Sequence, residues 1–408
     1  MKTKEAIIQK IENGTLVTPK GFQAGGMHTG LRYAKKDLGM LVSLVPAECA
    51  AVYTQNHVQA APLTVTRESL SKEQKLQAIV VNSAIANACT GEKGMKDAYD
   101  MRKLTASRLD IPDHFVAVAS TGVIGEYLDM EKIKKGIEEV SFARSKKGAE
   151  GFEEAILTTD TFTKRSCYEL TIDDQKVTIA GAAKGSGMIH PNMATMLAFI
   201  TTDANVPATV LQQMLKEVTD VTFNQITVDG DTSTNDMVLV MANGEAKHQP
   251  IDEHHPDVGL FKEGLRKVCE DLAKQIARDG EGATRLVEVS VQGASSRADA
   301  RVIAKNIVGS SLVKTAIYGS DANWGRIVGA IGSSEADVNP NEMEVYIGPH
   351  LMFKDGLPQS FSEEEVAEYL KQEEIRISVV MHLGNEEGKA WGCDLTYDYV
   401  KINASYRT

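Results

Sequence analysis

Short apolar runs that end in loops of small residues, each followed by a helical stretch, recur along this chain. Residues 78–82 have the composition of a buried strand and end in a small, polar loop, after which a helix is predicted over 95–109. A second run at 114–119 leads through a small-residue turn into a charged helix predicted over 129–140. Strands that alternate with helices in this order predict a mixed α/β architecture.

The same patterns predict most of the remaining elements. Strands are expected at 166–172, 176–182, 225–229, 237–241, 284–292, 375–382 and 390–400, and helices at 207–223, 257–278, 296–308 and just after Ser362. The strands at 225–229 and 237–241 are expected to pair around an acidic loop, and the last two strands to be joined across 384–388. Apolar and polar residues alternate in the final strand, which is typical of a half-buried strand.

Charge and cysteine content exclude several classes of protein. The net charge of −12 argues against nonspecific nucleic-acid binding, since neutralising phosphates requires clustered Lys and Arg. The five cysteines are scattered without a C-x-x-C pair, which indicates reduced thiols and neither a disulfide framework nor a zinc site. The first residues lack the apolar core of a signal peptide, and no run reaches the roughly 18 apolar residues of a membrane span. We therefore expect a cytoplasmic protein that binds neither membranes nor nucleic acids.

Residues 184–203 contain the most informative candidate site. A loop of small residues and proline runs into an apolar stretch, and Thr195 lies at the junction. A cut between Ala194 and Thr195 would leave a threonine with a nucleophilic hydroxyl and a free α-amine that can act as its general base. Spacing alone fits an ordinary strand threonine equally well. Ser186, which lies between two glycines, is a rival nucleophile, although it lacks the G-x-S-x-G pattern.

Two turns give weaker signals. The turn at 120–125, which contains Thr121 and Gly122, can aim backbone N–H groups and a hydroxyl at a developing oxyanion, or it can be an ordinary glycine turn. The turn at 279–284 places carboxylates after a predicted helix, where they are either exposed helix-end charges or groups that bind a cation. Neither turn decides between these interpretations.

The metal-binding patterns are weaker still. Residues 229–236 are acidic, but their glycine is misplaced for an EF-hand, and a solvated or hydrogen-bonded connection between strands is the better interpretation. His190, next to a proline, is expected to be structural. His254 and His255 have no third ligand at useful spacing, so no metal site is assigned.

With these segments identified, the chain resembles the ornithine acetyltransferase / glutamate N-acetyltransferase family of arginine biosynthesis over essentially its full length. The most specific segment is 184–197, and it is accompanied by the segments 120–125, 229–236, 278–284 and 403–408. Any one of these matches would be weak, but five in the family's order are a specific signal. No matched functional position departs from the family pattern.

The resemblance implies a fold and a maturation step. The fold is an αββα-type sandwich like that of N-terminal-nucleophile-like aminopeptidases, with a further, smaller α/β region. The chain would cut itself between Ala194 and Thr195 into an alpha chain, 1–194, and a beta chain, 195–408, which pack as one catalytic body. Two alpha and two beta chains would form a heterotetramer.

The resemblance also assigns roles to individual residues. Thr195 is the nucleophile, and Thr121 and Gly122 stabilise the oxyanion. The residues implied to bind substrate are Thr158, Lys184, Thr195, Glu281, Asn403 and Thr408. The implied reaction moves the acetyl group of N-acetylornithine to glutamate through an acetyl-Thr195 ester, without a bound cofactor or metal, and acetyl-CoA serves as a further acetyl donor if the enzyme is bifunctional.

Three alternatives stay open at this point. A monofunctional enzyme would use N-acetylornithine alone, and no residue named here separates it from a bifunctional one. A self-processing aminopeptidase or amidase would use water as the acceptor, but Lys184 and Glu281 favour a charged amino-acid substrate and hence transfer. A non-enzymatic binding protein would leave the five matching segments unexplained.

Overall fold

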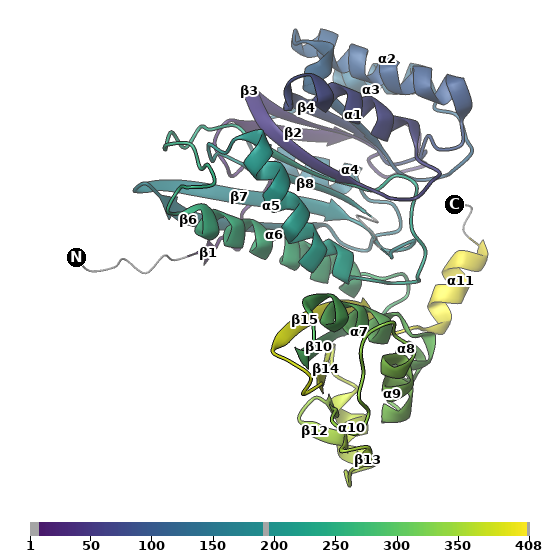
Figure 1. Ribbon diagram of the computed structural model, residues 1–408. Helices are drawn as coiled ribbons and strands as arrows, with labels where there is room; N and C mark the ends of the chain where they lie inside the picture. Colours follow the sequence, from purple (N-terminus) through teal and green to yellow (C-terminus); the bar gives the residue numbers. More distant parts are fainter. Residues whose placement is uncertain (1–7, 191–195, 406–408) are drawn as a thin grey trace.

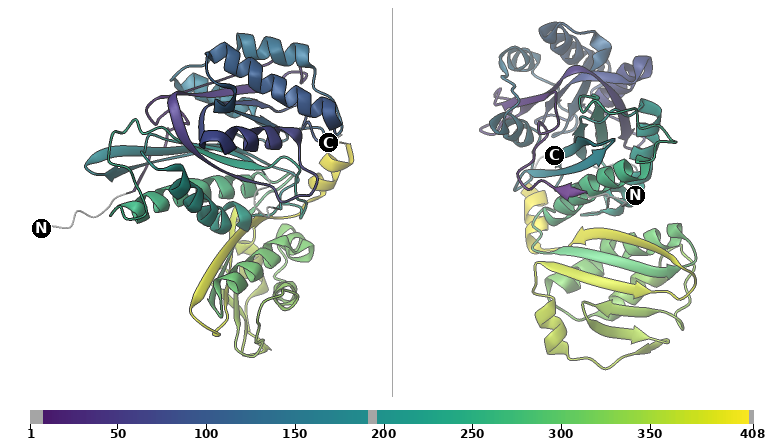
Figure 2. Two further views of the ribbon diagram at one scale, coloured as in Figure 1. Left: turned by 45° about the horizontal axis from the view of Figure 1, so that its top comes forward. Right: turned by 90° about the vertical axis from the view of Figure 1, so that its left-hand side faces the viewer.

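The strands of the protein form two separate sheets (Figure 1). The computed structural model describes residues 8–190 and 196–405, and in this part of the chain the larger sheet has nine strands and the smaller has six. Helices cover the faces of both sheets (Figures 1 and 2). The mixed α/β class predicted from the sequence is confirmed.

The larger sheet folds back on itself at its longest strand. Its order is β1 (Gln9–Lys10), β6 (Lys164–Ile172), β7 (Gln175–Lys184), β8 (Leu197–Thr202), β9 (Met237–Ala242), β3 (Leu38–Tyr53), β4 (Lys75–Asn82) and β5 (Val116–Ser120), with β2 (Phe22–Met27) beside β3. The second half of β3 pairs with β9 and the first half with β4, and the register shifts between Val42 and Ala47. Such irregularities bend a strand, and here one sheet becomes two stacked layers.

Alternate residues of the strands face different layers of the core. In β4, Ile79 and Val81 belong to an inner cluster that also contains Phe199 of β8, whereas Ala78 and Val80 belong to an outer cluster. The helices of that outer cluster are α1 (Ala61–Glu73), α2 (Gly91–Leu109) and α3 (Met130–Glu139). On the opposite side, α5 (Ala208–Val221) and α6 (Val258–Arg278) cover β7, β8 and β9 (Figure 1). The predicted αββα sandwich is therefore confirmed.

Helix α6 shows how the sequence pattern generates this packing. Its apolar residues recur every three or four positions, and all of them are buried in the cluster beneath β7 and β8: Phe261, Leu265, Val268, Leu272 and Ile276. Burying each such side chain contributes about 1.5–3 kcal/mol. The helix predicted at 257–278 is confirmed, and its buried apolar side chains hold one outer layer on the sandwich.

In the larger sheet, strands that follow residues 191–195 lie between strands that precede these residues. β8 and β9 follow this segment, yet they lie between β7 and β3, which precede it. β7 pairs with β8 from Ile179↔Thr202 to Lys184↔Leu197, and β3 pairs with β9 from Glu48↔Ala242 to Tyr53↔Met237. Both edges of the β8–β9 pair are therefore hydrogen-bonded to the earlier part of the chain. Helix α4 (Lys146–Ala155) also comes from that part and contributes Phe152 to the inner core.

The smaller sheet forms the second region expected from the resemblance. Its order is β13 (Leu357–Pro358), β12 (His350–Lys354), β11 (Glu344–Ile347), β14 (Glu374–Val380), β10 (Leu286–Ala294) and β15 (Glu386–Cys393). The helices of this region are α7 (Arg297–Gly309), α8 (Ser311–Tyr318), α9 (Trp324–Gly332) and α10 (Glu363–Tyr369). Trp391 of β15 is buried in the same cluster as α6, which joins the two regions.

The predicted strand at 225–229 is wrong. Residues Phe223–Gln225 form a short 3-10 helix, and beyond them the described chain makes only an isolated bridge between Ile226 and Trp391. β9, its expected partner, is already paired with β8 on one edge and β3 on the other. No edge of β9 is left for a hairpin, and the acidic segment instead runs toward the candidate site.

The predicted hairpin between the strands at 375–382 and 390–400 is also wrong. β10 lies between β14 and β15, so the two strands expected to pair are not neighbours. The last strand ends at Cys393 because its partner begins at Leu286, which pairs with Cys393. Beyond that point the chain forms helix α11 (Tyr397–Ser405), whose Tyr397 is 81% exposed. The alternation of apolar and polar residues that predicted a strand therefore continues beyond Cys393, where the pairing of β15 with β10 ends.

Other predictions from composition can be checked directly. Ser362 caps α10 by accepting a hydrogen bond from the Glu365 N–H, which confirms the predicted capping signal. All five cysteines lie in the described residues and are free thiols. Across residues 8–190 and 196–405, we find no helix with the length and apolar character needed to cross a membrane.

Candidate active site

A cavity of about 250 Å³ gathers most of the predicted site residues. It is lined by the loop after β5, the loop after α4, the end of β7, the acidic segment before β9, the turn after α6, and α11. The predicted residues that line it are Thr121, Gly122, Thr158, Lys184, Glu281 and Asn403. Ala194, Thr195 and Thr408 lie outside the described residues. Met196, which follows Thr195 in the sequence, also lines the cavity.

The Thr121–Gly122 turn lines the cavity, and its Gly122 N–H is the group of interest. The N–H groups of the two neighbouring residues already have acceptors, because Thr121 N donates to the Asn82 carbonyl and Val123 N to the Ala84 carbonyl. Within the described residues, the Gly122 N–H has no such acceptor. Gly122 has φ +123°, and a Cβ there would lie 2.2 Å from the Ala84 carbonyl oxygen. Only glycine fits this position, and its free N–H is suited to an oxyanion.

A buried network of charges supports the floor of the cavity. Lys164 Nζ lies 2.6 Å from Asp160 Oδ1 and 2.5 Å from Asp279 Oδ2. Asp160 also accepts N–H bonds from Gly185 (2.7 Å) and Thr158 (2.9 Å). Burial alone would raise the pKa of Asp160, but Lys184, Lys164 and the Gly185 N–H hold it well below its usual range. Asp160, Asp279 and Lys164 thus stabilise one another while buried, and the charge of Lys184 also acts on Asp160.

Lys184 is the cation of this network that lines the cavity. It ends β7 and is buried. Burial lowers the pKa of Lys184, and Asp160, Asp236 and Glu281 partly oppose this effect. A substrate carboxylate in the cavity would add a negative charge beside the ammonium group of Lys184.

Glu281 faces the same cavity from the turn after α6. A Cβ on Gly187 would lie 2.4 Å from Glu281 Cδ, so the Lys184–Met188 loop packs directly on this carboxylate. Glu281 N donates to the Ser186 carbonyl over 3.0 Å, and Asn403 Nδ2 donates to Glu281 Oε2 over 2.7 Å. Glu281 is thereby held from both sides, and its negative charge is placed opposite Lys184 in the lining.

The rival nucleophile Ser186 is occupied elsewhere. It is buried, and its hydroxyl donates to the Asp279 carbonyl over 2.6 Å. Asp279 is also buried and bonded to Lys164, so the interpretation of the 279–284 turn as an exposed helix-end charge is wrong for this residue. Both side chains fix the turn that carries Glu281.

The acidic segment at 229–236 holds the glycine loop in place. Asp229 accepts the N–H groups of Met188 (2.7 Å) and Ile189 (2.9 Å), which confirms a hydrogen-bonded connection. Burial raises the pKa of Asp229, and the bonds from Ile189 and Met188 oppose that rise. Asn235 donates to the Ser120 carbonyl over 2.8 Å and so links this segment to the Thr121–Gly122 turn.

Asp236 is a buried carboxyl that sequence analysis did not single out. It lines the cavity at the start of β9, and in the described part of the chain its Oδ2 has no hydrogen-bond partner. Burial raises the pKa of Asp236 well above its usual range, although a hydrogen bond from Ser233 and the charge of Lys184 oppose the rise. Asp160 and Lys164 were also missed, because isolated charged residues in loops and strands give no signal of burial.

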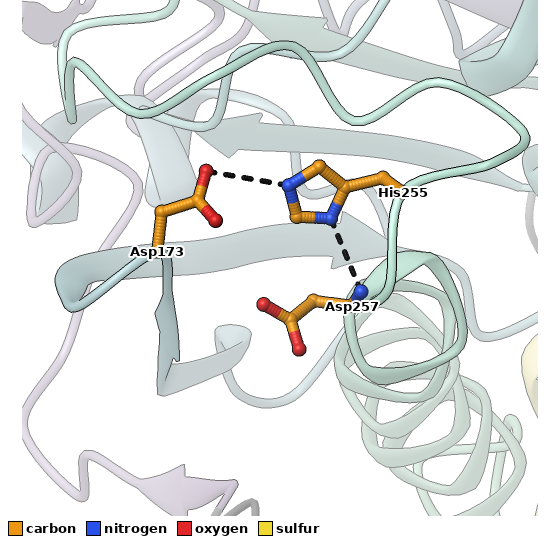
Figure 3. Close-up of side chains that lie close together, drawn as sticks. All are labelled: Asp173, His255 and Asp257. Atoms are coloured by element: carbon orange, nitrogen blue, oxygen red, sulfur yellow. Dashed lines mark hydrogen bonds and ion pairs between the residues drawn. The ribbon is translucent and has the colours of Figure 1, made fainter.

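Two histidine segments discussed above serve structural roles. His190 Nδ1 lies 3.0 Å from Thr227 Oγ1, and burial lowers the pKa of His190 to about 4. His255 lies near Asp173 and Asp257, whose ligand atoms are within 4.8 Å of one another (Figure 3). Its Nδ1 accepts the Asp257 N–H (3.1 Å), so its Nε2 carries the proton that faces Asp173 (3.3 Å). A metal ligand must present a lone pair, whereas this ring joins the β6–β7 turn to the start of α6.

Comparison with known proteins identifies the family. A family model described as the ArgJ family matches residues 23–408. A relative from Geobacillus kaustophilus, named arginine biosynthesis bifunctional protein ArgJ, is 64% identical over 403 residues, covering 99% of this chain and 98% of that protein. A Bacillus subtilis protein of the same name is 63% identical over 395 residues, or 97% of each chain. A crystal structure of Bacillus halodurans ArgJ is 55% identical, with a TM-score of 0.46 over 47% of this chain and 100% of that one. The chain belongs to the ArgJ family.

Proposed function

We propose that this enzyme of arginine biosynthesis transfers the acetyl group of N-acetylornithine to glutamate through an acetyl ester on Thr195. Family membership supports the reaction, and one observation supports the residue roles. Gly122, Lys184 and Glu281 line the same cavity as Met196, the residue that follows Thr195. An oxyanion donor, a cation and an anion are the groups that acyl transfer between charged amino acids requires.

The proposed maturation step produces the nucleophile. The Thr195 hydroxyl attacks the Ala194 carbonyl carbon, the C–N bond breaks as the acyl group moves to oxygen, and the nitrogen takes up a proton. Water then hydrolyses the ester to release the carboxyl group of Ala194 and the Thr195 hydroxyl. The alpha chain, 1–194, and the beta chain, 195–408, would stay together, which the interleaved strands β7, β8, β9 and β3 support.

The proposed transfer has two half-reactions. The Thr195 hydroxyl attacks the acetyl carbonyl of N-acetylornithine, with the Thr195 α-amine accepting its proton. The oxyanion is stabilised by the Thr121 hydroxyl and the Gly122 N–H, and such a donor typically contributes about 3–4 kcal/mol. Ornithine leaves after its nitrogen takes up the proton. The glutamate amine then attacks the acetyl ester, forms N-acetylglutamate and returns the hydroxyl of Thr195.

Charge matching supports the substrate roles. Lys184 would neutralise the α-carboxylate that both substrates carry, and Glu281 would pair with the side-chain ammonium of ornithine. Asn403 orients Glu281, and Thr158 lines the cavity beside Asp160. Thr408, as implied by the resemblance, would complete the substrate contacts.

We infer further that acetyl-CoA is a second acetyl donor, so that the enzyme can also make N-acetylglutamate directly. The name of the relatives, which calls them bifunctional, supports this inference. We also propose an assembly of two alpha and two beta chains in the cytoplasm, with no bound cofactor.

Mass spectrometry and a transfer assay test this proposal. The purified protein should give two masses that sum to the 44.3 kDa chain plus one water, and it should convert N-acetylornithine and glutamate into ornithine and N-acetylglutamate. Thr195→Ala should give one uncut chain without transfer. Retained transfer in this variant would refute the nucleophile, and release of free acetate in place of N-acetylglutamate would indicate an amidase.

A further inference from the structure

A second open space lies against the wall of the catalytic cavity. It is a groove of about 810 Å³ between α7 and α9 in the smaller region. His190 and Gly230 line the groove, whereas their neighbours Ile189, Asp229 and Asp231 line the catalytic cavity. In the described part of the chain, the two spaces therefore adjoin at residues 189–190 and 229–231.

Gly230 contributes no side chain to the boundary between the two spaces. This residue is exposed, has φ +85°, and has no atom within 4 Å of the position a Cβ would occupy. At this residue no side chain stands between the two spaces. A ligand lying across Gly230 would place one end near Thr121 and Gly122 and the other between α7 and α9.

The groove differs from the cavity in its charged residues. The cavity lining combines Lys184 with Asp229, Asp231, Asp236 and Glu281, whereas the described residues that line the groove include Lys305 and Arg326 but no carboxylate. This pair of cations, in a lining without a described carboxylate, favours positive charge in the groove although the chain has a net charge of −12. It indicates an anionic ligand.

The two cations are held at the groove. Arg326 Nη1 donates to the Leu312 carbonyl (2.8 Å) and to Thr315 Oγ1 (3.1 Å), which fixes the guanidinium, while its Nε and Nη2 have no acceptor in the described chain. Burial lowers the pKa of Lys305 to about 8. A phosphate group would accept from both side chains.

We propose that the groove binds the phosphorylated nucleotide end of a coenzyme A thioester, whose acetyl end enters the catalytic cavity over Gly230. The proposal rests on the acetyl transfer proposed above and specifies where its second donor binds. In the donor step, the Thr195 oxygen bonds to the acetyl carbon, the C–S bond breaks, and the hydroxyl proton ends on the released thiol. N-acetylornithine, which carries no phosphate, would not need the groove.

Two glycines of α9 provide a matched pair of variants. Gly329 lines the groove and Gly332 does not, yet both are exposed and neither has an atom within 4 Å of the position that a Cβ would occupy. Gly329→Glu introduces a negative charge into the groove, and Gly332→Glu makes the same change one turn away. Both replace glycine in a helix with a better helix former, so both should fold.

Calorimetric titration of the matured enzyme with coenzyme A, and with pantetheine as the fragment without phosphates, tests the proposal. Coenzyme A should bind, Gly329→Glu should weaken it by about tenfold or more, and Gly332→Glu should leave it unchanged. Lys305→Met should weaken coenzyme A binding and Lys305→Arg should restore it. Pantetheine should bind more weakly than coenzyme A and should not respond to these variants.

Steady-state kinetics separate this proposal from the proposed function. Gly329→Glu should raise KM for acetyl-CoA but leave transfer from N-acetylornithine to glutamate unchanged. Absence of coenzyme A binding to the wild type, equal effects of the two glycine variants, or a change of oligomeric mass in Gly329→Glu without loss of binding would each overturn the groove assignment. Absence of transfer from N-acetylornithine would instead refute the proposed function, whatever the groove binds.

Discussion

Asn403 Nδ2 donates a hydrogen bond to Glu281 Oε2 across 2.7 Å, which joins helix α11 to the turn after α6. No described residue of α11 is buried, so this bond, the contacts of Tyr399 with the cavity and the ring contact between Tyr397 and Tyr318 fix how the helix lies. The C-terminal helix is thereby connected to the residue proposed to recognise ornithine.

Asn403→Asp should impair the use of N-acetylornithine. The substitution replaces a donor with a carboxylate that faces Glu281, and loss of a hydrogen bond to a charged group costs about 1.5–3 kcal/mol. We expect KM for N-acetylornithine to rise by about tenfold or more, measured with glutamate in excess. Lys401→Gln, an exposed change on the same helix, is the control, and an equal rise in that variant would contradict the role of Asn403.

Gly122→Ala should abolish most transfer. A Cβ would lie 2.2 Å from the Ala84 carbonyl oxygen, so the turn must move and carry its N–H out of position. Loss of one oxyanion donor lowers kcat by about 10²–10³. Gly125→Ala is the matched control, because Gly125 also has positive φ but open space in front of it. Equal loss of activity in both variants would indicate general strain in the turn.

Lys164→Met should destabilise the protein strongly. The substitution leaves Asp160 and Asp279 as buried carboxylates without their shared cation, and breaking a buried pair costs about 3–5 kcal/mol. Lys176→Met removes an ion pair with Glu169 at a position 75% exposed, where about 0–1 kcal/mol is expected. Urea unfolding of both variants measures the difference, and similar losses would show that the network is not buried in solution.

Glu153 should make stability fall as pH rises. Burial raises the pKa of Glu153 from 4.5 to about 7, and Arg165, 3.3 Å away, only partly opposes this. Between these values the folded protein retains a proton that the unfolded chain releases, so the free energy of unfolding decreases with rising pH and levels off above pH 7. Glu153→Gln removes this dependence and should be more stable than the wild type at pH 8 but not at pH 4.5. A pH-independent difference in urea unfolding would contradict the assignment.

The sequence predicted elements with strong periodicity and missed those decided by neighbours. The stripe on α6 and the cap of α10 depend on local spacing, and both are confirmed. The fate of residues 225–229 and 394–400 depended on whether a strand edge was available, which no local pattern reveals. In each case the adjacent strand was already paired or had ended.

The residues of the candidate site likewise fall into those that the sequence predicted and those that it missed. Residues with a family motif, such as Thr121, Lys184 and Glu281, lie together around the cavity. Among the charges that support them, Lys164 pairs with Asp160 four residues away and with Asp279 more than a hundred residues away, and these charges become recognisable only as buried ion pairs. Burial of charge is a tertiary property, and a single sequence does not encode it in any short segment.

The position of β8 and β9 between β7 and β3 has a consequence for how such an enzyme can be made. If the chain is cut before Thr195, neither product contains the complete larger sheet, since the alpha chain lacks β8 and β9 in its middle and the beta chain supplies only these two strands of it. Neither polypeptide could then form this sheet alone. We therefore expect both parts to be made as one chain, in one-to-one stoichiometry, and the cut to come after folding.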